Sequence, residues 1–187
     1  MTAPPRSRVA AGQLRVRLLS KADEPSLHAF SCGDPDLDDF LRTDALRLQA
    51  QRVASTYLAF LEEHLVAYMT LLTDAVVLET KERKRLALSS RDHPSVPALK
   101  IARLAVDEAF RTTHAGGGTA LLRIAHALAL DIANRVGCRL LTLDAYPAAL
   151  PFYEKLGFVV NRSKTYEGRQ RPSMRLDIFP AAPHSWA

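Results

Sequence analysis

The stretch Lys100–Leu122, KIARLAVDEAFRTTHAGGGTALL, decides how this chain is interpreted. Its apolar residues Ile101, Leu104 and Val106 predict a buried strand, and three consecutive glycines then open a long amphipathic stretch. At the N-terminus of a helix, unpaired N–H groups and the positive end of the helix dipole hold an anion. Glycine at that place lets the backbone approach the anion closely. The stretch therefore predicts a cradle for a phosphorylated cofactor.

The glycines match neither of two common phosphate-binding motifs. A P-loop needs a Lys-Ser/Thr pair after the glycines to reach the outer phosphates and a metal, and none follows here. A dinucleotide fingerprint has spaced glycines in a first βα unit, whereas these glycines are contiguous and no such unit opens the chain. A flexible loop before a helix is the alternative interpretation of this stretch taken alone.

Length and composition are those of a globular protein: 187 residues, of which 48% are hydrophobic and 24% charged. We expect a disordered tail over residues 1–12, one domain over 13–180 and a short C-terminal tail over 181–187. The first tail lacks the apolar core of a signal peptide, and no apolar run approaches membrane-spanning length. These features predict a cytoplasmic protein with no membrane association.

The cysteine content is low. Cys32 and Cys138 are too few for a disulfide framework or a thiolate metal site. Neither has a second Cys or a His at ligand spacing. The sequence therefore predicts a reducing compartment and no metal.

The net charge is +5, from 25 Lys and Arg against 20 Asp and Glu, and the excess is concentrated in two segments. Residues 81–85 hold four cations and one acid, and residues 162–177 hold five cations and two acids. Such clusters suit a nucleic-acid or phosphate partner. Solvated faces of a soluble protein are the alternative interpretation.

The hydrophobic pattern predicts strands and helices in alternation. Residues 31–52 predict a turn and then a helix whose apolar face includes Leu37, Leu41 and Leu48. Residues 55–78 have the alternation of a hairpin, with its turn at 62–64. The other expected elements are a strand at 14–19, a short helix and a mobile connection within 79–97, a strand at 100–106, a helix at 118–136, a strand at 139–143, a short helix at 150–155, and strands at 158–160 and 173–179. This order predicts a mixed α/β domain with one central sheet.

Two motifs resemble those of the GCN5-related N-acetyltransferases. RLAVDEAFR…GGGTALL resembles the family's strand and pyrophosphate loop. LLTLDAYPAALPFYEKLGF resembles its second signature, a strand and a short helix that ends in FYEKxGF. The resemblance covers almost the whole chain. It implies a single-domain α/β (α+β) fold, with a central mixed, mostly antiparallel sheet flanked by helices, and acetyl-CoA as the cofactor.

The first part of the chain resembles one branch of that family. FSCGDPDLDDFLRTDA is similar to the CG…LD.FL opening of a branch that includes the aminoacyl-tRNA-acetylating toxins of toxin–antitoxin pairs. PALKIARLAVD and the second signature also look like bacterial acetyltransferases of the same branch that have no assigned toxin role. The resemblance therefore leaves the acceptor open.

The resemblance places the cofactor on one strand and one loop. The backbone of Leu104, Ala105 and Val106 is expected to hydrogen-bond the pantetheine arm, and one N–H there to polarise the thioester carbonyl. The loop is two residues longer than the family pattern, so Thr112–His114 is expected to bulge. Arg111 is expected to add a charge-assisted contact to a phosphate. The expected loop register is Thr113, His114, Ala115, Gly116, Gly117 and Gly118, with the last three and Thr119 supplying N–H groups.

Acetyl transfer from a thioester to an amine needs a neutral amine, a polarised carbonyl and a proton for the leaving thiolate. By resemblance, Tyr153 is the general acid that supplies this proton, and a phenol with an ordinary pKa of about 10 is a suitable donor. The alternative is that Tyr153 packs its ring under the sheet while its hydroxyl reaches solvent. Asp144, Tyr146 and Glu108 lie near the expected site, and the sequence assigns none of them as the general base.

These observations predict an acetyl-CoA-dependent N-acetyltransferase that acts on the primary amine of a small metabolite or protein, by direct attack in a ternary complex. One alternative is toxin-like acetylation of the amino group of aminoacyl-tRNA, with tRNA and a small antitoxin protein as partners, which the basic segments favour. A second alternative is a non-catalytic CoA-binding regulator, against which Tyr153 in an intact FYEKLGF argues. A homodimer is expected from the family.

Overall fold

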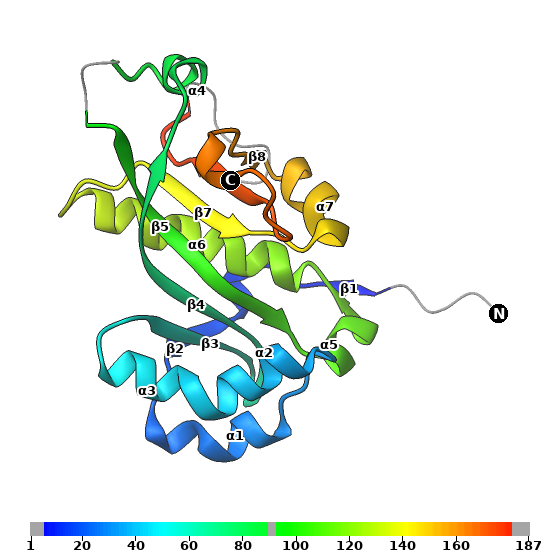
Figure 1. The fold of residues 1–187 in the computed structure, drawn as a ribbon. Helices are drawn as coiled ribbons and strands as arrows, with labels where there is room; N and C mark the ends of the chain where they lie inside the picture. Colours follow the sequence, from blue (N-terminus) through cyan, green and yellow to red (C-terminus); the bar gives the residue numbers. More distant parts are fainter. Residues whose placement is uncertain (1–5, 90–92, 181–187) are drawn as a thin grey trace. The chain divides into compact units, whose positions relative to one another are not determined.

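A computed structural model describes residues 6–89 and 93–180 as a mixed α/β fold (Figure 1). The strands are β1 (Ser7–Arg8), β2 (Arg15–Leu18), β3 (Ser55–Leu61), β4 (His64–Val77), β5 (Ser95–Val106), β6 (His114–Ala115), β7 (Leu140–Asp144), β8 (Val159–Val160) and β9 (Ser173–Asp177). The α-helices are α1 (Glu24–Ala29), α2 (Pro35–Asp39), α3 (Ala45–Ala50), α4 (Thr80–Arg85), α5 (Glu108–Thr113), α6 (Gly117–Ala133) and α7 (Leu150–Lys155). The other helical segments are the 3-10 turns η1 (Ala11–Gln13), η2 (Lys21–Asp23), η4 (Pro147–Ala149) and η5 (Lys164–Tyr166), and the π-helical turn η3 (Phe40–Asp44) that joins α2 to α3.

Within the described residues, seven strands form one sheet in the order β2-β3-β4-β5-β7-β9-β8, and β1 and β6 form a separate pair. The pairs β2–β3, β3–β4, β7–β9 and β8–β9 are antiparallel, whereas β5–β7 and β1–β6 are parallel. The mixed, mostly antiparallel sheet expected from the sequence is confirmed.

The chain forms two compact units. The first contains Met1–Leu72 and Ala102–Ile124, and the second contains Thr73–Ile101 and Ala125–Ala187. The strands β4 and β5 and the helix α6 each begin in one unit and end in the other. The single domain expected over 13–180 stays a prediction, because a pattern of apolar residues does not show where contacts between elements are dense.

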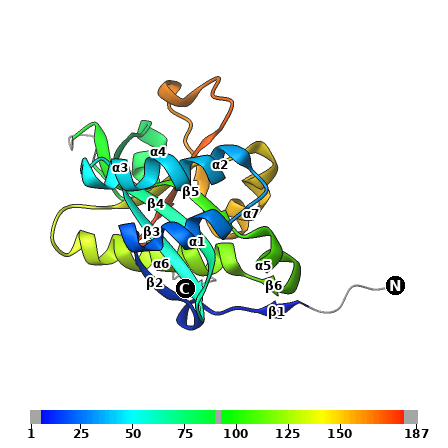
Figure 2. The ribbon, with the colours of Figure 1, turned by 90° about the horizontal axis from the view of Figure 1, so that it is seen from below.

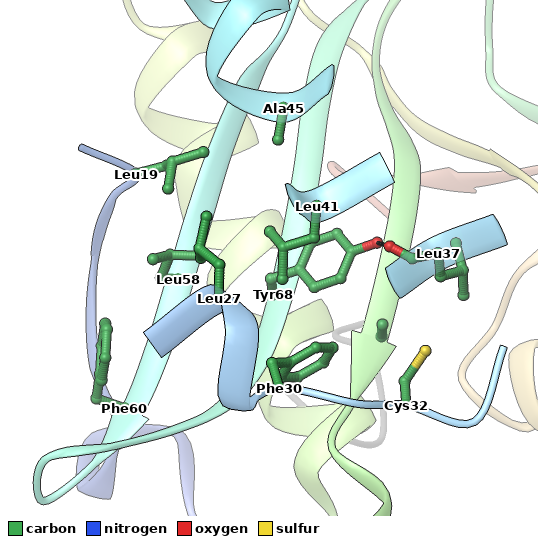
Figure 3. Close-up of a cluster of buried hydrophobic side chains, with 11 residues drawn as sticks. Leu19, Leu27, Phe30, Cys32, Leu37, Leu41, Ala45, Leu58, Phe60 and Tyr68 are labelled. Carbon is green, nitrogen blue, oxygen red and sulfur yellow. Dashed lines mark hydrogen bonds between the residues drawn. The ribbon is translucent and has the colours of Figure 1, made fainter. Parts of the chain in front are cut away.

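The first unit is held by buried side chains between its helices and its strands (Figure 3). Tyr68 of β4 is fully buried, and its ring meets Phe30 edge to face with the centroids 5.6 Å apart. The Tyr68 hydroxyl donates to the Leu37 carbonyl of α2 at 2.7 Å, so the polar end of the ring is satisfied inside the core. The other members of the cluster are Leu19, Leu27, Cys32, Leu41, Ala45, Leu58, Phe60 and Ala105.

The predicted hairpin is confirmed in the first unit. β3 and β4 pair as far as Leu61 opposite His64. Glu62 has a φ of 54°, so Glu62 and Glu63 make the tight turn and His64 already belongs to β4. The pairing buries residues 66–69 of β4 and so places Tyr68 in the core.

In the second unit, β7 is the central strand. It pairs in parallel with β5, from Ala98 opposite Leu140 to Ile101 opposite Leu143, and antiparallel with β9. Residues 140–143 are almost wholly buried, as expected for a strand with neighbours on both sides. The buried strand predicted at 139–143 is confirmed, with a shift of one residue.

The start of β5 and the helix α1 differ from expectation. β5 begins at Ser95, five residues before the predicted start, and continues through Pro97. The Pro97 carbonyl accepts the Arg139 N–H at 2.9 Å, so the proline takes part in the sheet through its oxygen. The helix α1 was not predicted, because six residues span too few turns to show a helical period.

The N-terminal segment also differs from expectation. Residues 6–12, expected within a disordered tail, include the strand β1 and the buried Val9. A strand of two residues has no period of its own and forms only because a partner strand lies more than 100 residues later in the chain. The rest of that tail, residues 1–5, the C-terminal tail over 181–187 and residues 90–92 of the expected connection lie outside the described residues.

The CG turn, residues 31–34 before α2, is fixed by Asp38. Its carboxylate accepts the Cys32 N–H at 2.8 Å and the Ser31 hydroxyl at 2.9 Å. Burial alone raises the pKa of Asp38, but the hydrogen bonds from Cys32 and Ser31 outweigh it, and the pKa lies below its ordinary value. The turn also docks on α5, because the Ser31 carbonyl accepts the Glu108 N–H at 2.8 Å.

Asp38→Asn is expected to lower the free energy of unfolding by about 2 kcal/mol near pH 7, because an amide accepts fewer hydrogen bonds than a buried carboxylate. The matched control is Asp39→Asn, since Asp39 is exposed and makes only a loose pair with Arg42. Because the pKa of Asp38 is lowered in the folded protein, its carboxylate stabilises the fold at pH values above the ordinary carboxyl pKa. The difference in unfolding free energy between Asp38→Asn and Asp39→Asn should therefore shrink as the pH falls below about 4. Urea unfolding at several pH values measures this; equal losses in both variants would contradict it.

Candidate active site

The glycines open α6, as the sequence predicts. Gly116 has a φ of 90°, a left-handed conformation that favours glycine, and its carbonyl accepts the Ala120 N–H at 2.8 Å. Gly116 therefore caps the helix, and the N–H groups of Gly117, Gly118 and Thr119 belong to the first helical turn. N–H groups in a first turn have no acceptor within their own helix and are available to an anion.

Gly117 lies where a side chain would be tightly packed. A Cβ at this residue would lie 3.2 Å from Cγ1 of Val106 and 3.3 Å from Cε1 of Phe110. The first turn of α6 therefore packs directly against the end of β5 and against α5. The helix has 17 residues and directs the positive end of its dipole to this loop. A helix N-terminus whose first turn begins with glycines fits a phosphate group.

The expected bulge at Thr112–His114 is wrong, because the extra residues belong to α5. Asp107 caps this helix and accepts the Phe110 N–H at 2.9 Å. His114 then follows in β6, and its ring stacks on Phe110 with the centroids 4.4 Å apart. The Asp-Glu pair at 107–108 is the signal in the sequence for a helix start at this place.

The residues expected to bind the cofactor lie on consecutive elements of the first unit. Leu104, Ala105 and Val106 form the end of β5, with Ala105 buried. The loop residues are Thr113 in α5, His114 and Ala115 in β6, Gly116 at the cap, and Gly117, Gly118 and Thr119 in α6. Nη2 of Arg111 donates to the Cys32 carbonyl at 2.6 Å, so one arm of its guanidinium braces the CG turn. The expected contact of Arg111 with a phosphate stays a prediction.

Tyr153 lies in α7 of the second unit. Gly157, with a φ of 87°, ends that helix, and the Phe158 N–H donates to the Tyr153 carbonyl at 3.1 Å. Phe158 is buried and meets the Tyr153 ring edge to face, with the centroids 5.7 Å apart. Burial raises the pKa of Tyr153, so the phenol keeps its proton at neutral pH. The ring is fixed by packing against Phe158, and the catalytic role of the hydroxyl stays a prediction.

The two carboxylates considered from the sequence belong to different units. Asp144, in the second unit, accepts from Nζ of Lys100 at 2.7 Å, and Nη1 of Arg169 lies 3.8 Å from its other oxygen. Glu108, in the first unit, starts α5 and bonds the Ser31 carbonyl through its N–H. The general base stays unassigned.

The cysteines are not poised for nucleophilic chemistry. Both are free and buried, and burial raises the pKa of Cys32 to about 11, so its thiol is protonated at neutral pH. Over residues 6–89 and 93–180, no group of three His, Cys, Asp or Glu side chains is arranged to hold a metal ion. In the same part of the chain, no helix has both the length and the apolar character needed to cross a membrane.

The Acetyltransferase (GNAT) domain family matches residues 54–160, which is more than half of the chain. The match contains the β3–β4 hairpin, the glycine loop and α7. The protein belongs to this family and is an N-acetyltransferase with acetyl-CoA as the acetyl donor.

Two similar proteins are toxins, and one of them, AtaT, is represented by two solved structures. The tRNA-acetylating toxin of Mycobacterium tuberculosis is 29% identical over 154 residues, which cover 81% of this chain and 87% of the toxin. The toxin AtaT complexed with acetyl-methionyl-tRNAfMet has a TM-score of 0.72 and 21% identity, over 88% of this chain and 94% of that one. A mutant AtaT bound to the C-terminus of the antitoxin AtaR and to acetyl-CoA has a TM-score of 0.69 and 21% identity, over 88% of this chain and 93% of that one. The two solved structures share the fold.

Tyr153→Phe is expected to lower turnover about 100-fold or more, because it removes a proton donor that acts in the transition state. The Kd of acetyl-CoA and the melting temperature should stay unchanged, since the ring keeps its packing against Phe158. Tyr57→Phe is the matched control for removal of one half-buried tyrosine hydroxyl. Steady-state kinetics and calorimetry measure these effects, and normal turnover would remove Tyr153 from the mechanism.

Gly117→Glu is expected to raise the Kd of acetyl-CoA at least about tenfold, because the side chain meets Val106 and Phe110 and adds negative charge at a helix N-terminus. Gly12→Glu adds the same charge where a Cβ has no neighbour within 4 Å, and should bind normally. Calorimetric titration of both variants measures the difference. A normal Kd for Gly117→Glu would show that another loop binds the cofactor.

Proposed function

We propose that this protein acetylates the amino group of aminoacyl-tRNA. The sequence alone favours a small metabolite or protein amine as the acceptor, with aminoacyl-tRNA as the alternative. The comparisons support the alternative better, since the curated relative is a tRNA-acetylating toxin and AtaT forms a complex with acetyl-methionyl-tRNAfMet. In this chain, the observation that carries the proposal is a basic surface on the second unit.

Glu82 brings the two basic segments of the sequence together. Its Oε1 accepts from Nη1 of Arg175 at 2.6 Å and from the Arg162 N–H at 3.1 Å. The side chains of Glu82 and Arg175 are only 5% and 4% exposed. Nη1 of Arg175 also donates to Oδ1 of Asn161 at 2.7 Å, which satisfies more of this buried pair. The helix α4 is thereby fixed beside the segment that joins β8 to β9.

The exposed cations of these segments form the basic surface. Its members are Lys81, Lys84, Arg85, Arg162, Lys164, Arg169 and Arg171. Arg83 and Arg175 belong to the same clusters in the sequence but are buried, and Arg83 donates to the carbonyls of Ser89, His93 and Pro94. The two buried arginines hold the segments of this surface in place through their hydrogen bonds. The seven exposed cations carry the positive charge that phosphates would meet.

Two arginines of the basic surface stack on tyrosines. The guanidinium of Arg171 lies 4.1 Å from the ring centroid of Tyr146, and that of Arg169 lies 4.7 Å from the ring centroid of Tyr166. Guanidinium planes and aromatic rings are the groups on which proteins stack unpaired bases of RNA. Tyr146, considered from the sequence as a catalytic residue, is assigned here to acceptor binding. These stacks support a nucleic-acid acceptor over a small amine.

The glycine loop is assigned to the diphosphate of acetyl-CoA. The N–H groups of Gly117, Gly118 and Thr119 would hold it, and the backbone of residues 104–106 would hold the pantetheine arm. The fit is supported by the absence of a side chain at Gly117, where a Cβ would meet Val106 and Phe110. Acetyl-CoA supplies the acetyl group as a thioester.

Tyr153 is assigned as the general acid. It would give its phenolic proton to the sulfur as the C–S bond breaks and the bond between the acetyl carbon and the amine nitrogen forms. The amine nitrogen would lose its own proton to water, which needs no dedicated base. The raised pKa of Tyr153 supports this role, because a general acid must be protonated before it acts. A non-catalytic regulator would have no use for such a group.

A small antitoxin protein is proposed as a partner, because the similar toxin AtaT is bound to the C-terminus of its antitoxin AtaR. A homodimer and a cytoplasmic location stay predictions from the family and the composition.

The test is transfer of radiolabelled acetyl from acetyl-CoA to bulk aminoacyl-tRNA, with free amines and polyamines assayed in parallel. Label on charged tRNA that disappears after deacylation is the expected result. Label only on a small amine would restore the acceptor favoured from the sequence. No label anywhere, with CoA still bound, would identify a regulator.

The basic surface gives this test a specific variant. Lys84→Gln with Arg85→Gln should raise the KM for aminoacyl-tRNA and lower the slope of log affinity against log salt by about 2, because each removed cation leaves one phosphate unneutralised. The Kd of acetyl-CoA should not change. Arg135→Gln, an exposed arginine outside the basic surface, is the control. An unchanged KM and salt slope would make the surface an ordinary solvated face.

A further inference from the structure

The N-terminal arm, residues 6–9, lies against the glycine loop in the first unit. Its strand β1 pairs in parallel with β6, and Figure 2 shows the two strands side by side next to α5. The Val9 N–H donates to the Ala115 carbonyl at 3.0 Å, and Val9 is only 7% exposed. The arm is thus attached to the loop by strand pairing and by one buried side chain.

The arm engages carbonyl oxygens of the loop. Besides the bond to Ala115, Oγ of Ser7 donates to the Thr113 carbonyl at 3.4 Å. The Gly116 carbonyl is bonded within α6. A carbonyl oxygen carries partial negative charge and repels a phosphate, whereas an N–H attracts it. With these three oxygens engaged, the loop offers its N–H groups to an anion.

Arg8 lies at the edge of this loop. Successive residues of a strand point to opposite faces, so the buried Val9 directs Arg8 outward. Cγ of Arg8 lies 3.6 Å from the position that a Cβ would take at Gly116, and the side chain is exposed. Arg6, two residues earlier, belongs to the same face of the arm. The arm therefore brings positive charge to the loop that is assigned to the diphosphate.

We propose that the N-terminal arm is part of the acetyl-CoA site: its pairing with β6 fixes the loop, and Arg8 binds a phosphate group of the cofactor. The proposal rests on the assignment of the diphosphate to the glycine loop. The charges of acetyl-CoA are on its phosphates and not on its acetyl group. The arm therefore acts on the affinity for the cofactor and not on acetyl transfer itself, through a charge-assisted contact.

Arg8→Gln in the full chain should raise the Kd of CoA about fivefold at low ionic strength, and the effect should shrink as salt is added. Arg47→Gln, another exposed arginine of the first unit, should leave the Kd unchanged. The melting temperature of the free protein should be the same for the unmodified chain and both variants. A normal Kd for Arg8→Gln at low ionic strength would overturn the contact.

Titration with 3′-dephospho-CoA identifies the phosphate that Arg8 binds. A loss of affinity that persists with this ligand assigns Arg8 to the diphosphate, and a loss that disappears assigns it to the 3′-phosphate. Both results support the contact.

Val9→Pro tests the pairing of the arm with the loop. It removes the N–H that donates to Ala115 and leaves Arg8 in the chain. We expect faster amide hydrogen exchange in residues 114–120 and a raised Kd of CoA, with Val9→Ala as the control for the smaller side chain. Exchange and affinity equal to those of Val9→Ala would overturn this part of the proposal.

Gly117→Glu separates the two assignments. If it binds CoA normally, the glycine loop is not the cofactor site and the proposed function loses that assignment. If it binds weakly while Arg8→Gln and Val9→Pro bind normally, the loop assignment holds and the proposal for the arm alone is wrong.

Discussion

The close packing at Gly117 is the constraint on which the first unit depends. The end of β5, the helix α5 and the start of α6 meet at this residue so closely that a Cβ would lie 3.2 Å from Val106 and 3.3 Å from Phe110. A side chain there would require these neighbours or the first turn of α6 to shift. Gly116 meets a different need, because its φ of 90° turns the chain into the helix. Of these consecutive glycines, Gly116 is needed for its backbone conformation and Gly117 for its lack of a side chain.

The CG turn supports this packing from the other side of α5. Asp38 orders the turn through Cys32 and Ser31, and the carbonyls of those two residues accept from Arg111 and Glu108. Asp107, which caps α5, also accepts the Ser31 N–H at 3.3 Å. A motif near residue 32 thus holds the segment that leads from β5 to the glycine loop. In this chain, the CG turn holds α5, and α5 leads into the glycine loop. This connection gives a physical reason for the two motifs to occur together.

Much of the fold and part of the site could be predicted from the sequence, because some signals are local. Alternation predicted the β3–β4 hairpin, and Gly157 marked the end of α7 beside Tyr153. Other features depend on partners far away in the chain. Nothing local in the sequence shows that the Cys32 carbonyl accepts a hydrogen bond from Arg111, 79 residues later in the chain. The arm was expected to be disordered because a two-residue strand exists only through its partner.

The buried pair of Glu82 and Arg175 shows why charge in a sequence differs from charge on a surface. Removing two charges from water is costly, so such a pair contributes little net stability compared with apolar residues of similar size. What it provides is position. Glu82 Oε2 accepts the Glu79 N–H at 3.0 Å, while Oε1 accepts from Arg162 and Arg175, so one carboxylate joins the start of α4 to the segment before β9. An apolar contact is not directional and would leave α4 free to rotate, and the exposed cations would lose their fixed spacing. The buried carboxylate therefore determines where the exposed positive charge lies.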